Sequence, residues 1–126
     1  EFESHYESYA KDGILAWDNH APRQKQIVGI PVFISEYGGI RWPDETVDGW
    51  GYGNAPTTPE EYFARYRGLT EALLNNPDIC GFCYTQLYDV EQEMNGLYTY
   101  SRKPKFDMEI IRKINSRKAA IEEGKA

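Results

Sequence analysis

The segment IVGIPVFIS, residues 27–35, contains hardly a polar side chain and is followed directly by EYGG, residues 36–39. A short, continuous apolar run of this kind predicts a strand that is buried on both faces, as strands of parallel sheets are. The carboxylate and the two glycines then predict a turn. We therefore expect a buried strand over residues 27–35.

Next to that strand, the sequence predicts a helix with well-defined ends. TPEE at residues 58–61 has the form of a capping box, in which Thr58 is the N-cap, Pro59 is the first helical residue and Glu61 is the third. Apolar residues then recur at helical spacing up to Leu73. NNP at residues 75–77 ends the helix.

A second strand and a second helix complete the pattern. Residues 79–87 predict another buried strand, residues 96–100 a short extended segment, and a last helix begins near Asp107. Strands that alternate with helices are typical of an α/β architecture with parallel strands. A complete (βα)8 barrel takes about 250 residues, so the 126 residues would be part of one or a small open α/β unit. Residues 1–26 are predicted to be a loop-rich segment before this α/β domain of residues 27–126.

Charge and composition exclude several classes of function. The chain carries 14 basic and 20 acidic side chains, a net charge of -6, and has no basic stripe to bind phosphates. No apolar run approaches the roughly 20 residues that span a bilayer, and no signal peptide is recognisable. The sequence predicts neither a nucleic-acid partner nor a membrane segment, and its free thiols favour a cytoplasmic location.

The cysteines and histidines predict no metal site and no cofactor. Cys80 and Cys83 lie in the second predicted strand, where residues three apart point in opposite directions. We therefore expect two small core residues that neither bridge each other nor share a metal. His5 and His20 lack a ligand pattern such as H-x-x-x-H.

Glu36 is the main candidate for chemistry. It follows the first predicted strand and precedes a glycine pair, and substrates of α/β proteins bind at the carboxyl ends of the strands. The glycines would let a ligand approach closely. From position alone, a carboxylate that simply caps the strand and bonds turn amides is the slightly better interpretation.

Three motifs resemble glycoside hydrolase family 2, the β-galactosidase and β-glucuronidase family. VFISEYGG at residues 32–39 is similar to strand seven of its (βα)8 barrel, and GFCYTQLYD at residues 81–89 to strand eight. The closing stretch before the final helix is matched by NGL at residues 95–97 and RKPK at residues 102–105. The resemblance implies a partial (βα)8 (TIM) barrel that contains the last two βα units.

The resemblance also implies a retaining glycosidase in which Glu36 is the nucleophile and the partner is a β-glycoside. Such an enzyme needs a second carboxylic acid about 5–5.5 Å away to protonate the leaving oxygen. In the family this acid is the Glu of an Asn-Glu pair after strand four, and no such dipeptide occurs in the 126 residues. We expect the acid/base to lie upstream and the isolated chain to be inactive.

Four further residues are candidates for substrate binding. Trp42 and Trp50 lie in the loop that leaves the first strand and would stack on sugars, or else hold that loop on the protein body. Gln86 and Asp89 follow the second strand and would bind sugar hydroxyls, although Asp89 fits a turn cap equally well. The acidic run around Asp89 lacks the spacing of an EF-hand.

Two departures from the family leave the sugar undefined. Thr85 stands where many members have Trp, and Gly39 stands where β-galactosidases have His. The alternative function is a non-catalytic α/β module that binds a glycan or a protein. A segment cut from a barrel would also expose a strand edge and an apolar face, so we expect self-association.

Overall fold

A computed structural model describes residues 29–42 and 53–124 of the chain. Its elements follow the order β1 (Val32–Gly38), α2 (Pro59–Leu74), β2 (Ile79–Thr85) and α3 (Met108–Asn115), with a short 3-10 helix, Ala120–Glu123, at the end. The predicted loop-rich segment 1–26 and Trp50 lie outside the described residues. In the described part, no helix is long and apolar enough to cross a bilayer.

The helix α2 begins and ends where the sequence predicts. Thr58 is the N-cap, and its Oγ1 accepts a hydrogen bond of 3.2 Å from the amide of Glu61. The Glu61 carboxylate bonds back to the amide and hydroxyl of Thr57 at 2.7 and 2.9 Å, which satisfies a further donor at the helix start. The last helical residue is Leu74, and Asn75 forms the C-cap.

The helix α3 also confirms its prediction. Asp107 is the N-cap, and its side chain accepts from the amide of Glu109 at 3.0 Å. Ile111 and Ile114, three residues apart, are buried on one face.

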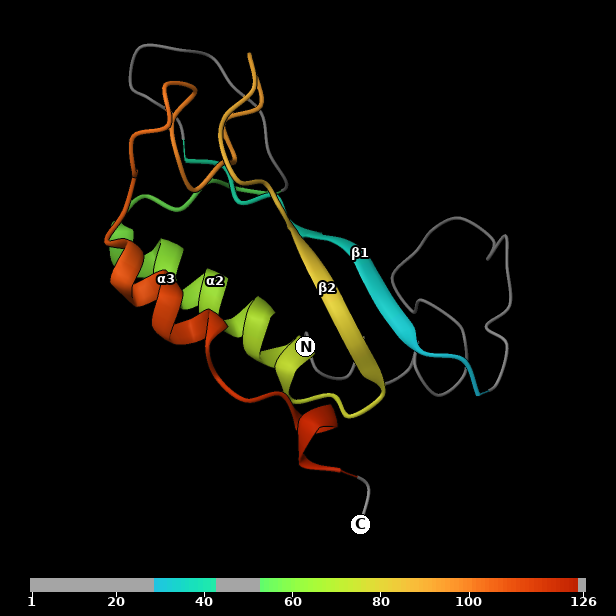
Figure 1. The fold of residues 1–126 in the computed structure, drawn as a ribbon. Coiled ribbons are helices and arrows are strands. Elements are labelled where there is room, and N and C mark those ends of the chain that lie inside the picture. Colours follow the sequence, from blue (N-terminus) through green and yellow to red (C-terminus); the bar gives the residue numbers. More distant parts are fainter. Residues whose placement is uncertain (1–28, 43–52, 125–126) are drawn as a thin grey trace.

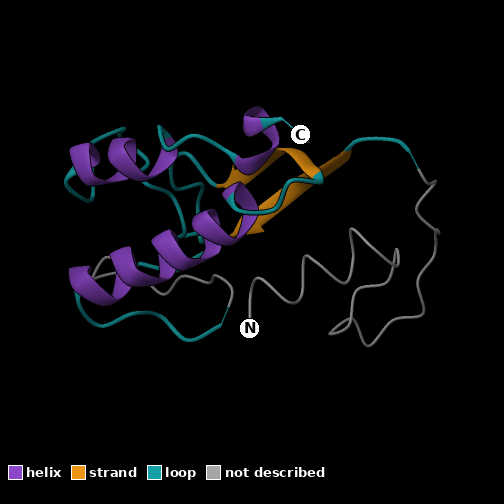
Figure 2. Ribbon diagram, turned by 90° about the horizontal axis from the view of Figure 1, so that it is seen from below, coloured by secondary structure: helices purple, strands orange, loops and turns teal. Residues whose placement is uncertain are grey.

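The two strands form a parallel sheet, and α2 connects one to the other. Figure 1 shows α2 and α3 side by side on the same side of this sheet, and Figure 2 shows the same arrangement from below. The predicted α/β class is therefore confirmed. Because the strands are parallel, their carboxyl ends and the loops that follow them lie at one end of the sheet (Figure 1).

The predicted strand bounds and their burial need correction. β1 covers Val32–Gly38 rather than residues 27–35, and β2 ends at Thr85 rather than at residue 87. Within residues 96–100, only Tyr98 forms bridges, which are isolated. Burial on both faces was also wrong, because Phe33 is 58% exposed. Among the described elements, helices cover only one face of the sheet, so only the side chains toward α2 are buried. We call the opposite face, on which Phe33 lies against Gly81, the distal face.

Each strand contains an extra residue that shifts the pairing. Ile34 pairs with Phe82 but Tyr37 with Tyr84, so β1 has a bulge at residues 35–36. Val32 pairs with Ile79 but Phe33 with Gly81, which places a second bulge at residue 80. A bulge changes which face the following side chains occupy.

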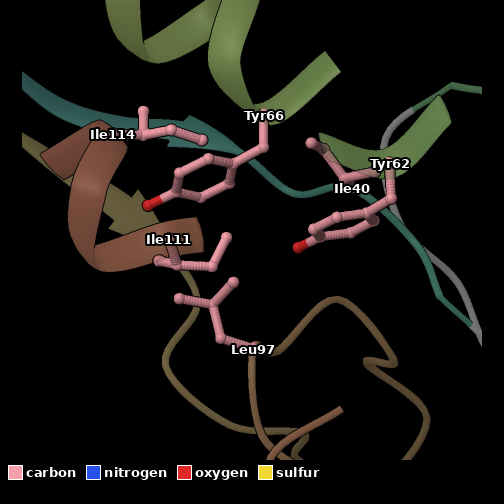
Figure 3. Close-up of a cluster of buried hydrophobic side chains, with 6 residues drawn as sticks. All are labelled: Ile40, Tyr62, Tyr66, Leu97, Ile111 and Ile114. Atoms are coloured by element: carbon pink, nitrogen blue, oxygen red, sulfur yellow. The ribbon is translucent and has the colours of Figure 1, made fainter. Parts of the chain in front are cut away.

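The core consists of two adjoining clusters. The first joins α2, α3 and the loops after the strands, and Figure 3 shows its members converging from these segments: Ile40, Tyr62, Tyr66, Leu97, Ile111 and Ile114. The second joins the sheet to α2 through Val32, Tyr37, Leu73 and Ile79. The hydroxyl of Tyr37 lies 3.0 Å from that of Thr70 in α2, which satisfies both buried groups. The helices thus cover one face of the sheet, and the exposed Glu36 is not part of that packed face.

Candidate functional site

The loops at the carboxyl ends of the strands form one connected layer, which we call the rim (residues 39–42 and 86–105). The amide of Gly39 donates to the carbonyl of Thr85 at 2.7 Å, and the amide of Trp42 donates to the carbonyl of Met94 at 2.9 Å. The amide of Leu97 donates to the carbonyl of Gln86 at 3.2 Å. The loop after β1 is therefore bonded directly to the loop after β2.

Glu36 lies within β1, two residues before the strand ends, and its side chain is exposed. The next residue, Tyr37, packs toward α2 and is 5% exposed. Since neighbouring residues of a strand point to opposite faces, Glu36 lies on the distal face. Strict alternation from Val32 and Ile34 would instead direct it at α2. The bulge at residues 35–36 prevents this, and no sequence signal announces it.

Gly38, the first of the two glycines after Glu36, makes room for a protein side chain. Gly38 has φ +95°, and a Cβ added there would overlap the ring of Tyr84. Only glycine adopts this conformation without strain and tolerates so close a ring. Gly38 thus packs β1 against β2 at the start of the rim.

Asp89 is a buried residue that holds the rim together. Its side chain is 4% exposed, and its Oδ1 accepts from the amide of Gly96 at 2.9 Å and from Nζ of Lys105 at 2.6 Å. The two interpretations from sequence were a ligand for sugar hydroxyls and a turn cap. These contacts are those of the turn cap, strengthened by an ion pair.

Trp42 and Gln86 lie in the rim, half-buried. The Trp42 ring meets the rings of Tyr62 and Phe106 edge-on, with centroids 5.9 and 5.3 Å apart. These contacts hold the Trp42 loop on the protein body, which is the second of the two interpretations from sequence. Gln86 follows a cis peptide bond from Thr85, and its Nε2 donates to the carbonyl of Glu93 at 3.3 Å.

The cysteines are not core residues, contrary to prediction. Cys80 and Cys83 are both free and exposed. The alternation argument failed because β2 has its bulge at residue 80: Ile79 and Phe82, also three residues apart, both pack into the cluster against α2. In the described part of the chain, no group of three or more His, Cys, Asp or Glu is arranged to hold a metal.

Sequence reasoning missed three rim residues. Lys105 donates not only to Asp89 but also to the carbonyls of Trp42 and Met94, at 3.2 and 3.4 Å. Arg41 and Asn95 each have a buried polar side-chain atom without a hydrogen-bond partner. The only sequence signals are the place of Lys105 in RKPK and that of Asn95 in NGL, and none identifies Arg41.

Two tyrosines beneath the rim have strongly shifted pKa values. The hydroxyls of Tyr62 and Tyr84 lie 2.9 Å apart beneath the rim. Burial raises the pKa of both far above the usual value, so both stay neutral at physiological pH. Glu36 is therefore an exposed carboxylate beside a rim that is built on neutral aromatic residues.

No protein-family model and no curated protein sequence matches this chain.

Proposed function

We propose that the chain is the C-terminal part of a (βα)8 barrel from a retaining β-glycosidase similar to family 2, and that Glu36 is its nucleophile. The observation that carries the proposal is the position of Glu36. It is an exposed carboxylate on the face of a parallel strand pair that α2 does not cover, near the carboxyl end of β1.

The described architecture supports a barrel origin. In a (βα)8 barrel the helices surround the strands, the inner faces of the strands meet, and the active site lies at their carboxyl ends. The described residues have these features: parallel strands, helices on one face, and a rim that joins the two loops. β1 and β2 would correspond to strands seven and eight, and the distal face to the inside of the barrel.

The double displacement of a retaining glycosidase requires two carboxyl groups. Glu36 can be the nucleophile, and the motifs of this chain do not supply the acid. In the double displacement, a carboxylate attacks the anomeric carbon and a second carboxylic acid protonates the leaving oxygen. Glu36 would do the first. Without an Asn-Glu pair in the 126 residues, the isolated chain has no candidate for the second. We therefore expect it to leave ordinary aryl β-glycosides intact.

Covalent trapping tests the proposal without an acid. In 2,4-dinitrophenyl 2-deoxy-2-fluoro-β-glycosides the leaving group departs unprotonated, while the fluorine slows hydrolysis of the glycosyl-enzyme. We expect the galacto or the gluco reagent to add one sugar mass to the peptide that contains Glu36. Glu36→Gln should abolish the adduct, and Glu60→Gln, which changes an exposed carboxylate of α2, should leave it unchanged. Labelling that survives Glu36→Gln, or no adduct with either sugar, contradicts the assignment.

Self-association of this chain is part of the proposal. The distal face presents Phe33, and among the described residues both strands of the sheet are edge strands. Light scattering over a range of concentrations should show a mass above 14.6 kDa that decreases on dilution. A strictly monomeric species at high concentration would contradict it.

A further inference from the structure

Asn95 and Gly96 form the only Asn-Gly dipeptide of the 126 residues, and this dipeptide lies within the rim. Both residues are buried, and Asn95 is only 2% exposed. A Cβ added at Gly96 would overlap the backbone of Tyr88 and Asp89, so only glycine fits after Asn95. The packing of the rim therefore requires a dipeptide that is chemically reactive.

Asn-Gly is the dipeptide in which an asparagine most readily modifies itself, because glycine has no side chain to hinder the reaction. After losing its proton to hydroxide, the amide nitrogen of Gly96 attacks Cγ of Asn95. The new N–Cγ bond closes a succinimide ring, and Nδ2 leaves as ammonia with a proton from water. Water then opens the ring at either carbonyl, which gives aspartate or isoaspartate at residue 95. The net change consumes one water and releases one ammonia.

The folded rim restrains each step of this reaction. The Gly96 amide donates to Oδ1 of Asp89 at 2.9 Å, so its hydrogen is withheld from hydroxide. The peptide groups on either side are also fixed. The amide of Gln86 donates to the carbonyl of Asn95 at 3.4 Å, and the amide of Leu97 donates to the carbonyl of Gln86 at 3.2 Å. Because the Asn95 side chain and the Gly96 peptide must rotate together to bring the nitrogen to Cγ, this bonded backbone resists the attack.

We propose that Asn95–Gly96 is a latent self-modification site: the closed rim keeps it unreactive, opening of the rim converts Asn95 to aspartate or isoaspartate, and the product prevents the rim from closing again. The site thus makes a reversible local opening irreversible. The inference concerns the rim alone and is independent of the assignment of Glu36 as a nucleophile.

The effect of the product on the rim follows from charge and from backbone length. Oδ1 of Asn95 is buried and has no hydrogen-bond partner among the described residues, so aspartate would put a negative charge at an unpaired position. The three hydrogens of the Lys105 ammonium already have three acceptors, namely Asp89 and the carbonyls of Trp42 and Met94. Lys105 therefore has none left for a second carboxylate. Isoaspartate also adds one carbon to the backbone, between peptide groups that the rim holds in register.

Conversion rates in the folded and the unfolded chain test the protection. The original chain is incubated at mildly alkaline pH in buffer and in guanidinium chloride. Mass spectrometry of its peptides then follows the replacement of –NH2 by –OH. Asn54 is the internal control, because it is exposed and is followed by alanine. We expect Asn54 to convert faster than Asn95 in buffer, and Asn95 to convert faster than Asn54 in denaturant. This comparison does not require that any variant folds.

A variant that opens the rim should release the reaction. Lys105→Met leaves the buried Asp89 unpaired, and conversion of Asn95 in buffer should accelerate about a hundredfold or more, the factor that corresponds to a broken buried ion pair. Arg112→Met breaks the exposed pair with Glu109 and is the matched control. It should change the rate by no more than about fivefold.

Amide hydrogen exchange at Gly96 tests the consequence of conversion. Asn95→Asp should raise the exchange rate of this amide at least about tenfold, because the unpaired charge favours the open rim. Asn54→Asp should leave the rate unchanged. An unchanged or lower rate in Asn95→Asp, as when the new carboxylate pairs with Arg41, would show that the product does not hold the rim open.

Two results would overturn the protection itself. If Asn95 converts as fast in buffer as in denaturant, the folded rim does not restrain it. If Asn95 converts faster in buffer and Asp89→Asn removes the difference, Asp89 takes the Gly96 proton as a base and promotes the reaction. Conversion that is slow in buffer, fast in denaturant and accelerated by Lys105→Met supports the proposed site.

Discussion

Nζ of Lys105 lies 2.6 Å from Oδ1 of Asp89, and both side chains are at most 6% exposed. The ammonium has three hydrogens, and three acceptors surround it: the carboxylate of Asp89 and the carbonyls of Trp42 and Met94. One fully paired charge therefore joins the loop after β1, the loop after β2 and the segment before α3.

Breaking this pair is expected to destabilise the chain strongly. Lys105→Met leaves a buried carboxylate without its cation, which typically lowers the free energy of unfolding by about 3–5 kcal/mol. Asp89→Asn in the same background should recover part of the loss, because a neutral amide oxygen still accepts from Gly96. Urea unfolding measures both changes.

The pair Arg112–Glu109 is the matched control, since it has the same 2.6 Å separation but side chains that are 66% and 51% exposed. Arg112→Met should lower the free energy of unfolding by no more than about 1 kcal/mol. If Lys105→Met is as mild as Arg112→Met, the buried pair does not hold the rim together.

Gly38→Ala is expected to lower the free energy of unfolding more than Gly53→Ala does. Gly38 has φ +95°, and its new methyl group would overlap the Tyr84 ring. Gly53 also has a positive φ, +68°, but a Cβ there meets nothing within 4 Å. Gly53→Ala should lower the free energy of unfolding by about 1–2 kcal/mol, because the backbone conformation is unfavourable for alanine. Gly38→Ala should lower it by about 1–3 kcal/mol more, because the methyl group also overpacks the space beside the ring. Equal losses in urea unfolding would show that the ring moves aside freely.

Local signals in the sequence predicted the helices well. The caps Thr58 and Asp107 bond to amides two or three residues away, so their effect can be read from neighbouring letters. The strands were harder, because their burial depends on which face the helices cover. Bulges at residues 35–36 and 80 then changed the face on which Glu36 and Cys80 lie.

The site was predictable only where its residues act alone. Glu36 became a candidate from its place near the end of a predicted strand alone. The role of Asp89 depends on Lys105, sixteen residues away, and the position of Trp42 depends on Met94, in a loop more than fifty residues away. Such contacts are set by tertiary packing and leave no periodic pattern in the sequence.

The exposed cysteines predict fast thiol chemistry in the folded chain. Cys80 and Cys83 are both exposed and unpaired as thiols, so a colorimetric thiol reagent should modify both without denaturant. Cys80→Ser and Cys83→Ser should each leave one thiol that reacts at a similar rate. If the thiols reacted only in urea, Cys80 and Cys83 would be buried in the folded chain and the prediction would be wrong.

Alkaline pH is expected to destabilise the chain through Tyr62 and Tyr84. Burial raises the pKa of both hydroxyls above the ordinary value of 10.0 in the folded state. Above pH 10 the unfolded chain therefore loses protons that the folded chain keeps, so the stability that is fully present below pH 10 falls as the pH rises. Each tyrosine should lower the free energy of unfolding by about 1.4 kcal/mol per pH unit in this range.

The double variant Tyr62→Phe/Tyr84→Phe removes both hydroxyls of the 2.9 Å pair together, so that neither loses its partner in the pair alone. Its free energy of unfolding should depend much less on pH above 10 than that of the original chain. Tyr100→Phe, at a tyrosine that is 66% exposed, should leave the dependence unchanged. Tyrosinate absorbance followed in parallel should rise for the buried pair only as the chain unfolds. If the pair ionises in the folded chain, the hydroxyls are accessible to solvent and the aromatic layer beneath the rim is not closed.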